Sequence, residues 1–298
     1  MINSEIIGKI KELYGKGENI LEFLKMQGNA PNDVESIMIS YDFQAGTYTK
    51  LAVENSDYLN QYTNAITEVF AALPAFKSVM EVGVGEATLM NPLMSKVDPF
   101  NKVEKFGFDI SWSRVRYAKQ NSEKAGNSIS LFIANLFEIP LADNAIDIVY
   151  TSHSLEPNGG KEKQALTELY RVTKNYLVLL EPDYENATSE GKARMIRHGY
   201  VQNLEGHASE LGMKVIKNSP FGVCINPLNP TGLTIIEKKQ KSQSAPSGYV
   251  CPISKKKLEK HENVLFSQET GLLYPIIDNI PCLLSTSAVL ASHFMDFR

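Results

Sequence analysis

Apolar positions along the chain change from a helical pattern to an alternating pattern near residue 75. In residues 1–75, apolar side chains recur three or four positions apart, as Ile6, Ile10 and Leu13 do, which predicts amphipathic helices. From residue 78 to residue 237, short apolar runs alternate with amphipathic stretches. We predict strands at residues 78–82, 105–109, 129–134, 146–150, 176–180, 213–217 and 233–237.

Helix-like stretches separate many of these runs. We predict helices at residues 111–125, 161–172 and 189–211. Strands that alternate with helices are typical of βαβ units. The pattern therefore predicts an α/β fold, with a Rossmann-like, doubly wound, mostly parallel sheet of about seven strands. An N-terminal helical cap and a small C-terminal β-rich domain would complete it.

A polar stretch near residue 240 suggests a domain boundary. It reads KKQKSQSAPSG and is rich in residues that favour loops. We therefore expect a helical cap or lid at residues 1–75, a cofactor-binding domain at 76–238, a linker at 239–248 and a small domain at 249–298.

Composition narrows the class of protein. The chain has 298 residues, of which 43% are hydrophobic, and its net charge is −4, which disfavours general attraction to nucleic acid or anionic membranes. Its apolar runs are too short to span a bilayer, and its N-terminus has no signal-peptide core. The cysteines Cys224, Cys251 and Cys282 are too scattered for a disulfide framework. We expect a cytoplasmic protein with reduced thiols.

The segment SVMEVGVGEAT, residues 78–88, carries the most specific chemistry. Two glycines after an apolar strand permit a tight turn and close backbone approach to a ligand, although they could also be ordinary turn glycines. A dinucleotide fingerprint would need a small residue at position 88, which is Thr. The pattern of Glu81, Gly83, Gly85 and Ala87 instead resembles motif I of class I S-adenosylmethionine-dependent methyltransferases.

Two later strand ends extend this resemblance. It implies that Asp109 accepts hydrogen bonds from the ribose hydroxyls, as a carboxylate can; the alternative is that Asp109 caps the next helix, for which Ser111 is also a candidate. By the same resemblance, Asn135 would accept from the adenine amino group and Leu136 would offer its backbone N–H. Asp147 is expected to cap or pack locally.

A segment before the sheet supplies candidate lid residues. YDFQAGTY, residues 41–48, is similar to a segment that crosses the cofactor mouth in many small-molecule methyltransferases. That resemblance implies that Gln44 and Tyr48 contact the methionine end of the cofactor. The alternative is an ordinary loop between packed helices.

Candidate catalytic residues follow the fourth strand. Ligands bind at the carboxyl ends of strands in open α/β sheets, and His153 lies there with an ordinary pKa suited to proton transfer near neutrality. Glu156 and His198 are alternative catalytic residues. Arg194, Arg197 and His198 could bind an anionic or hydroxyl-rich acceptor. Structural histidines and a solvated helix face are the competing interpretations. The remaining candidates are Glu181, Asp183, Tyr184 and Glu185, in a polar cluster after the fifth strand.

The C-terminal segment resembles a second family. Residues 248–285, with Cys251-Pro-Ile-Ser254 and Pro281-Cys282, are similar to the zinc-ribbon-like activator subunit of tRNA and protein methyltransferases. A structural zinc needs about four Cys or His ligands. Only Cys251, His261 and Cys282 lie nearby, so we expect no metal site.

Together these features predict an enzyme, an S-adenosylmethionine-dependent methyltransferase. Its acceptor would be a hydroxyl or amine of a small molecule, with a sugar or sugar nucleotide of surface-glycan biosynthesis as one class. One alternative is a tRNA or protein methyltransferase, suggested by the activator-like segment. Another is a non-catalytic S-adenosylmethionine-binding scaffold, suggested by Ala87 and Asn135, where the family usually has Gly and Asp. A nicotinamide oxidoreductase fits least. A homodimer of this chain is a further possibility that the sequence leaves open.

Overall fold

The computed structural model describes residues 4–18, 20–26, 33–98, 102–238 and 248–297. Of the predicted linker, residues 239–247 lie outside the described residues. In the parts of the chain that are described, no helix is both long enough and apolar enough to cross a membrane.

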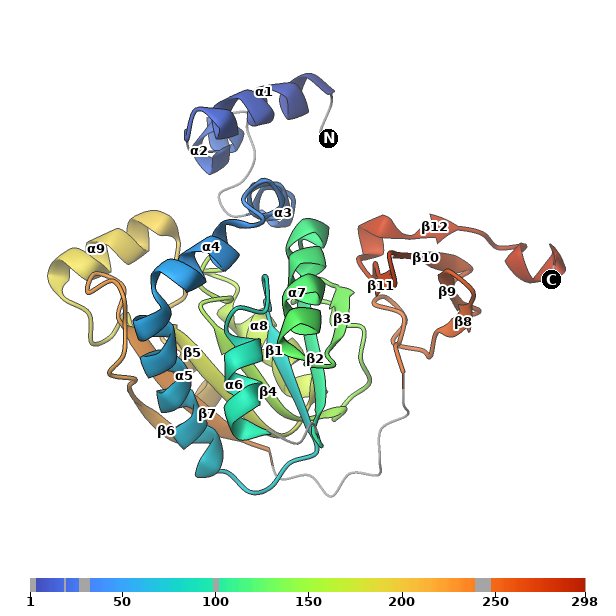
Figure 1. The fold of residues 1–298 in the computed structure, drawn as a ribbon. Helices are drawn as coiled ribbons and strands as arrows, with labels where there is room; N and C mark the ends of the chain where they lie inside the picture. The colour runs from blue at the N-terminus through green and yellow to red at the C-terminus, as the bar shows by residue number, and fades with distance from the viewer. Residues whose placement is uncertain (1–3, 19, 27–32, 99–101, 239–247, 298) are drawn as a thin grey trace.

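A seven-stranded sheet forms the centre of the molecule (Figure 1). Its strand order is β3-β2-β1-β4-β5-β7-β6. Strands β1 to β5 pair in parallel, and β7 runs antiparallel to both β5 and β6. The strands are β1 (Ser78–Val82), β2 (Glu104–Asp109), β3 (Ser130–Ile133), β4 (Ile146–Ser152), β5 (Thr173–Pro182), β6 (Lys214–Pro220) and β7 (Thr231–Glu237). The predicted α/β fold is confirmed.

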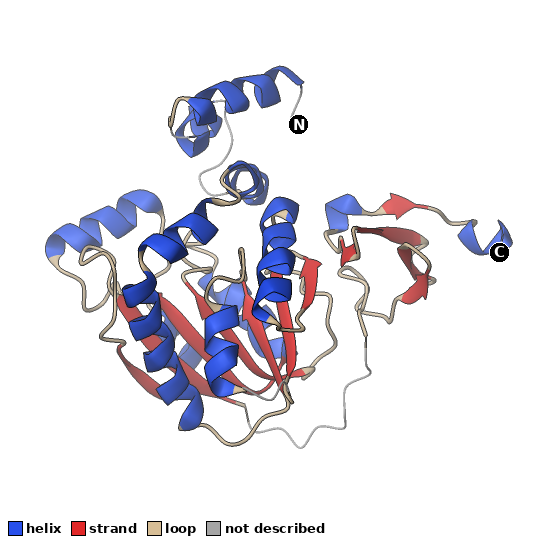
Figure 2. Cartoon of the chain, in the orientation of Figure 1, coloured by secondary structure: helices blue, strands red, loops and turns tan. Residues whose placement is uncertain are grey.

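Helices cover both faces of this sheet, as Figure 2 shows. The N-terminal helices are α1 (Ser4–Gly15), α2 (Ile20–Met26), α3 (Val34–Phe43), α4 (Thr47–Glu54) and α5 (Ser56–Ala71). Of these, α1 to α3 lie beyond one end of the sheet, and α5 packs on one of its faces (Figure 1). The later helices are α6 (Met90–Val97), α7 (Trp112–Ala125), α8 (Glu162–Val172), α9 (Ser189–His198) and α10 (Leu204–Glu210).

The single helix predicted for residues 189–211 is wrong. The chain forms α9 and α10 instead, with a break between them. Gly199 ends α9 in the left-handed conformation at φ 67°, and Asn203 begins α10 at φ 49°. Left-handed residues stop the helical hydrogen-bond ladder. The helical spacing of apolar residues continues across the break, so the sequence pattern did not predict it.

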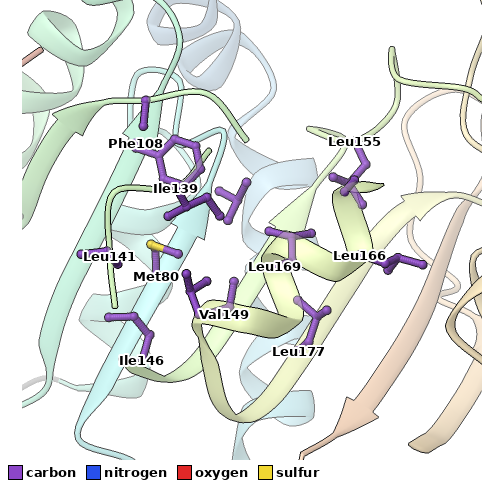
Figure 3. Close-up of a cluster of buried hydrophobic side chains, with 14 of the residues drawn as sticks. Met80, Phe108, Ile139, Leu141, Ile146, Val149, Leu155, Leu166, Leu169 and Leu177 are labelled. Carbon is purple, nitrogen blue, oxygen red and sulfur yellow. The ribbon is translucent and has the colours of Figure 1, made fainter. Parts of the chain in front are cut away.

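Alternation along the strands divides the core into two layers. Val79, Ile148 and Tyr150 face helices α5 to α7. Met80 and Val149 face the other way, toward α8 and α10, with Leu166 and Leu169 of α8 packed over the sheet (Figure 3). All five residues of β1 are buried, because a parallel strand covered on both faces points alternate side chains into the two layers.

The C-terminal residues form a small β-rich module, residues 248–297, that packs beside β3 and contributes to both layers of the core. Its strands are β8 (Glu259–His261), β9 (Val264–Ser267), β10 (Leu272–Ile277), β11 (Ile280–Pro281) and β12 (Val289–Leu290), and its short 3₁₀ turns are η1 (Ser285–Ser287) and η2 (Phe294–Phe297). Its buried Cys251, Tyr274 and Leu283 belong to the same apolar cluster as Met80 and Phe132. The module therefore shares the core of the sheet.

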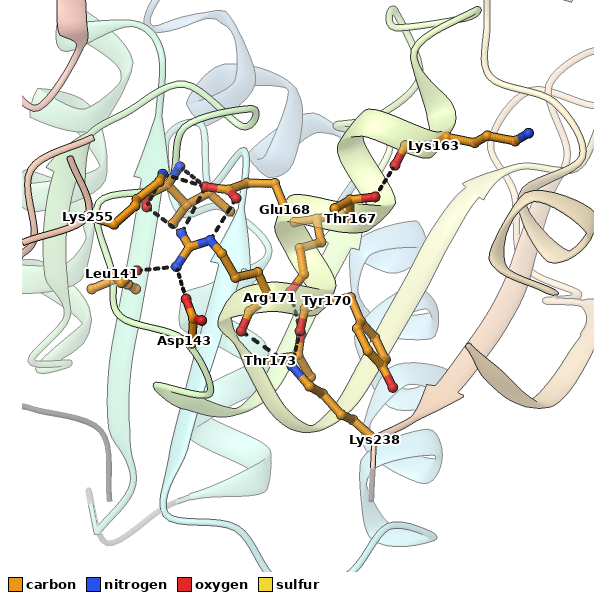
Figure 4. Close-up of polar contacts among 12 residues, drawn as sticks. Leu141, Asp143, Lys163, Thr167, Glu168, Tyr170, Arg171, Thr173, Lys238 and Lys255 are labelled. Carbon is orange, nitrogen blue, oxygen red and sulfur yellow. Dashed lines mark hydrogen bonds and ion pairs between the residues drawn. The ribbon is translucent and has the colours of Figure 1, made fainter. Parts of the chain in front are cut away.

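Polar contacts fix this module to the sheet. The described residues between β3 and β4, 134–145, form no helix, and the module occupies that side. Val250 N donates to Pro140 O at 3.0 Å, and Leu283 N donates to Ile133 O at 2.8 Å. Lys255 pairs with Glu168 of α8 at 2.9 Å, beside the Glu168–Arg171 pair (Figure 4).

Candidate functional site

A cavity of about 380 Å³ lies at the carboxyl ends of β1, β2 and β4. Residues of α3, α4 and α5 also line it. That residues 1–75 act as a cap or lid stays a prediction. The volume of the cavity falls within the range of small-molecule sites, and its place at the strand ends is where open α/β sheets bind ligands.

The glycine loop after β1 forms one wall. Gly83 and Gly85 have φ 71° and 52°, a region that side chains rarely adopt. A Cβ at Gly83 would lie 2.4 Å from Ser154 Cβ, so no larger residue fits there. Ala87 also has positive φ, at 55°, and lies buried beneath the loop.

Asp109 lies at the end of β2 inside the cavity. It accepts from Gly85 N at 3.1 Å and from Ser111 N at 2.9 Å. Burial raises the pKa of Asp109, and the Arg114 charge opposes that rise. The N-cap of α7 is Ser111, whose Oγ accepts from Arg114 N at 3.1 Å. Asp109 is therefore not needed as the cap, and its carboxylate faces the cavity.

The other predicted cofactor residues divide between cavity and packing. Glu81 lines the cavity, accepts from Tyr150 Oη at 2.9 Å, and has its pKa raised by burial to about 8. Asn135 and Leu136 also line it. Asp147 lies at the opposite end of β4 and accepts from the backbone N–H of Ser78 at 3.2 Å, so it packs locally.

The two lid residues differ. Tyr48 lines the cavity from α4. Gln44 is not among the residues that line it; its Nε2 donates to Ser40 Oγ at 2.9 Å. Tyr48 therefore lies in the cavity wall and Gln44 does not. The contact of Tyr48 with the methionine end stays a prediction.

Glu86 was missed by sequence reasoning, although it directly follows the glycine loop. It is 1% exposed and accepts from Gly46 N at 2.8 Å, Tyr48 N at 3.3 Å and Thr49 N at 2.7 Å, and from the Thr49 hydroxyl. Helix α4 has no side-chain cap of its own, so Glu86 caps it from the loop. One carboxylate thus joins the glycine loop to the lid.

His153 lies at the cavity edge with both ring nitrogens engaged. Nδ1 is 2.7 Å from Glu156 Oε2, and Nε2 is 2.8 Å from Thr231 Oγ1. Burial alone would lower the pKa of His153, but the hydrogen bond and charge of Glu156 outweigh burial and raise it. An imidazole with a carboxylate on one nitrogen is oriented as general bases are. To receive a proton, Nε2 must first lose its bond to Thr231.

Glu181 shapes the loop that carries His153. Its carboxylate accepts from the backbone N–H groups of Ser154, Leu155 and Glu156, each at 3.1 Å. Burial raises the pKa of Glu181 to about 7. Asp183 accepts a hydrogen bond from the side chain of Asn186. Glu181 and Asp183, two acids of the predicted polar cluster, thus both hydrogen-bond to neighbouring protein groups.

The residues predicted on α9 are not brought to the cavity. His198 is exposed, with its ring centroid 5.5 Å from that of Tyr200. Arg194 lies over Tyr200, with Cζ 5.5 Å from the ring centroid, and Arg197 is exposed. Neither α9 nor Glu156 contributes to the cavity lining. The described residues also contain no grouping of three His, Cys, Asp or Glu side chains that could hold a metal ion.

Comparison with known proteins agrees with this geometry. Residues 79–176 match the family described as "Methyltransferase domain". Curated proteins give no match. The match to this family confirms the predicted methyltransferase, an enzyme whose cofactor is S-adenosylmethionine.

Several solved structures are also similar. An Aquifex aeolicus SAM-dependent methyltransferase is 19% identical, with TM-score 0.44 over 58% of this chain and 88% of that one. Magnesium protoporphyrin IX methyltransferase from Synechocystis with bound SAM is 15% identical, with TM-score 0.45 over 63% and 82%. A chain of the Haloferax volcanii complex between the Trm112 activator and a methyltransferase is 13% identical, with TM-score 0.49 over 66% and 96%.

Proposed function

We propose that this enzyme transfers the methyl group of S-adenosylmethionine to a hydroxyl or amine of a small molecule bound in the same cavity. The observation that carries the proposal is the continuity of one cavity. It runs from Gly83, Gly85 and Asp109 to the 152–158 loop and to Tyr58 and Tyr62 of α5. Because these residues line one cavity, an acceptor bound near α5 and the 152–158 loop would lie next to a cofactor bound at the glycine loop.

The residues at the cofactor end fit the group that the family implies. Asp109 offers a carboxylate to the ribose hydroxyls, and Asn135 and Leu136 lie at the end of β3, where the adenine ring would bind. A Cβ at Gly83 would meet Ser154 Cβ at 2.4 Å, so this glycine lets the 152–158 loop approach the glycine loop closely. When bound, the cofactor supplies a methyl group activated on a sulfonium.

The protein contributes position and proton transfer. Tyr58, Leu59 and Tyr62 of α5 line the cavity, where they would help to align an acceptor with the methyl group. For a hydroxyl acceptor, His153 Nε2 is the candidate base, and Glu156 holds the ring through Nδ1. The acceptor hydroxyl would take the place of Thr231 Oγ1. An amine that is already unprotonated needs no base.

The experiment separates acceptor classes. Protein is incubated with methyl-deuterated S-adenosylmethionine and with three fractions of a cell extract: molecules below about 1 kDa, RNA and protein. A deuterated methyl group in the small-molecule fraction supports the proposal, and one in RNA or protein alone rejects it. His153→Ala should slow turnover at unchanged cofactor affinity. Wild-type turnover in that variant would exclude His153 as the base.

Narrower features of the proposal rest on sequence resemblance. A sugar or sugar nucleotide is our first acceptor class, and the small-molecule fraction tests it directly. The activator-like resemblance of residues 248–285 favours tRNA or protein as the second candidate, against which the net charge of −4 weighs. A cytoplasmic location belongs to the same proposal.

A further inference from the structure

Arg114 is a buried cation in the wall of the cavity that the sequence did not single out. It is the third residue of α7 and only 3% exposed. Its Nε donates to the backbone oxygen of Tyr41 at 3.0 Å, which ties α7 to the last turns of α3. The side chain lines the cavity.

Two lid tyrosines hold the guanidinium in place. Its Cζ lies 4.7 Å from the ring centroid of Tyr41 and 4.3 Å from that of Tyr48. Cation–π contacts of this kind stabilise a charge but leave the N–H edge of the guanidinium available. On the other side, Nη1 is 3.8 Å from where a Cβ of Gly85 would lie. The group therefore sits over the glycine loop.

The guanidinium has hydrogen-bonding capacity left over. Arg114 Nη2 is buried and has no hydrogen-bond partner among the described residues. The oxygens of Asp109 already accept from Gly85 and Ser111. A buried charge with an unpaired N–H is costly unless an anion or a strong acceptor satisfies it. The cavity wall thus presents a fixed, incompletely paired cation.

The charges of the ligand identify what this cation can bind. S-adenosylmethionine has a positive sulfonium, a positive ammonium and one negative group, the α-carboxylate. Its ribose and adenine are neutral. Guanidinium and carboxylate form paired hydrogen bonds with matching geometry. Building on the proposed function, we propose that Arg114 binds the α-carboxylate of the cofactor and so selects ligands that carry the amino-acid part.

The test compares ligands that differ at the carboxylate. Calorimetry measures the affinity of the wild-type protein for S-adenosylhomocysteine, for its carboxamide analogue and for 5′-methylthioadenosine, which lacks the amino-acid part. We expect the carboxamide to bind on the order of ten- to a hundredfold more weakly than S-adenosylhomocysteine. Equal affinity of these two ligands would overturn the inference without requiring any variant to fold.

Variants assign the effect to Arg114. Arg114→Met should weaken binding of S-adenosylhomocysteine by a similar factor and binding of 5′-methylthioadenosine only slightly. Its affinity for the carboxamide should also fall only slightly, because the variant and the carboxamide each remove the same interaction. Arg114→Lys should recover part of the loss. The matched control is Arg116→Met on the same helix, whose partner is Asp278 at 2.5 Å outside the cavity, and it should bind normally.

Two results would count against different claims. An equal loss of both nucleosides in Arg114→Met would mean that Arg114 serves the ribose or adenine, which overturns the inference and leaves the proposed function intact. Failure of the wild-type protein to bind any of the three nucleosides would instead reject the proposed function.

Discussion

Replacing Glu86 should make local opening of α4 easier and leave the packing of the sheet unchanged. Its carboxylate receives three backbone N–H groups at the start of α4 and one hydroxyl, over a sequence separation of up to 40 residues. In Glu86→Gln, one acceptor oxygen remains and the other is replaced by an amide N–H₂, which is a donor. Because the groups at the start of α4 are donors too, some of their N–H groups lose their acceptor.

The magnitude follows from known helix-end energetics. Loss of an N-cap contact costs about 1–2 kcal/mol, and an anion near a helix N-terminus contributes up to about 2 kcal/mol in a buried setting. We expect local opening of α4 to become easier by about 2 kcal/mol, which corresponds to roughly 30-fold faster amide exchange.

Hydrogen exchange at Gly46, Tyr48 and Thr49 is the assay. The matched control is Glu123→Gln, because Glu123 is exposed on α7 and should leave exchange at these positions unchanged. Affinity for S-adenosylhomocysteine should fall several-fold in Glu86→Gln, since Tyr48 reaches the cavity from α4. Unchanged protection at all three amides, or an equal loss in the control, would refute the capping role of Glu86.

Three further substitutions test residues at the ends of β1 and β2. Asp109→Ala should weaken S-adenosylhomocysteine binding at least about tenfold by calorimetry, whereas Asp147→Asn, at the far end of the sheet, should not; equal affinities would remove Asp109 from the ribose site. Gly83→Ala should lower both thermal stability and cofactor affinity, because its Cβ would meet Ser154 Cβ at 2.4 Å and φ is 71°; a variant that melts and binds like wild type would contradict this geometry. Burial holds the pKa of Glu81 at about 8, above the ordinary 4.5, so the folded state binds more protons than the unfolded state. The free energy of unfolding should therefore fall as pH rises from about 4.5 to about 8. Glu81→Gln should flatten that dependence in urea titrations, and an unaltered slope would show that Glu81 is ionised when folded.

Strand ends could be predicted from the sequence because they combine two local signals. An apolar run gives the strand, and the residue after it must lie at the carboxyl edge of a parallel sheet. Gly83, Asp109 and Asn135 follow this rule, and all three line one cavity. Their distances along the chain did not matter, since the sheet brings its strand ends together.

Residues whose position depends on packing between distant segments could not be found this way. Glu86 meets α4 about 40 positions earlier in the chain, and Arg114 meets Tyr41 across 73 positions. On α9, Arg194, Arg197 and His198 were candidates for binding the acceptor, yet the sequence does not show which way this helix faces. The helical spacing of apolar residues also continues past Gly199, where the left-handed backbone separates α9 from α10.

The placement of the C-terminal module has a consequence for association between molecules. Strand β3 ends the sheet, and an uncovered end strand offers its N–H and C=O groups to any other chain. Ile133 pairs with Cys282, and Leu283 N donates to Ile133 O at 2.8 Å, so the chain closes this end with its own backbone. A chain ending at residue 238 would expose both that edge and the apolar surface over Phe132, and we expect it to elute from size-exclusion chromatography as aggregates; a monomeric peak would show that the edge is protected by other means. We therefore expect the module to reduce self-association through this edge.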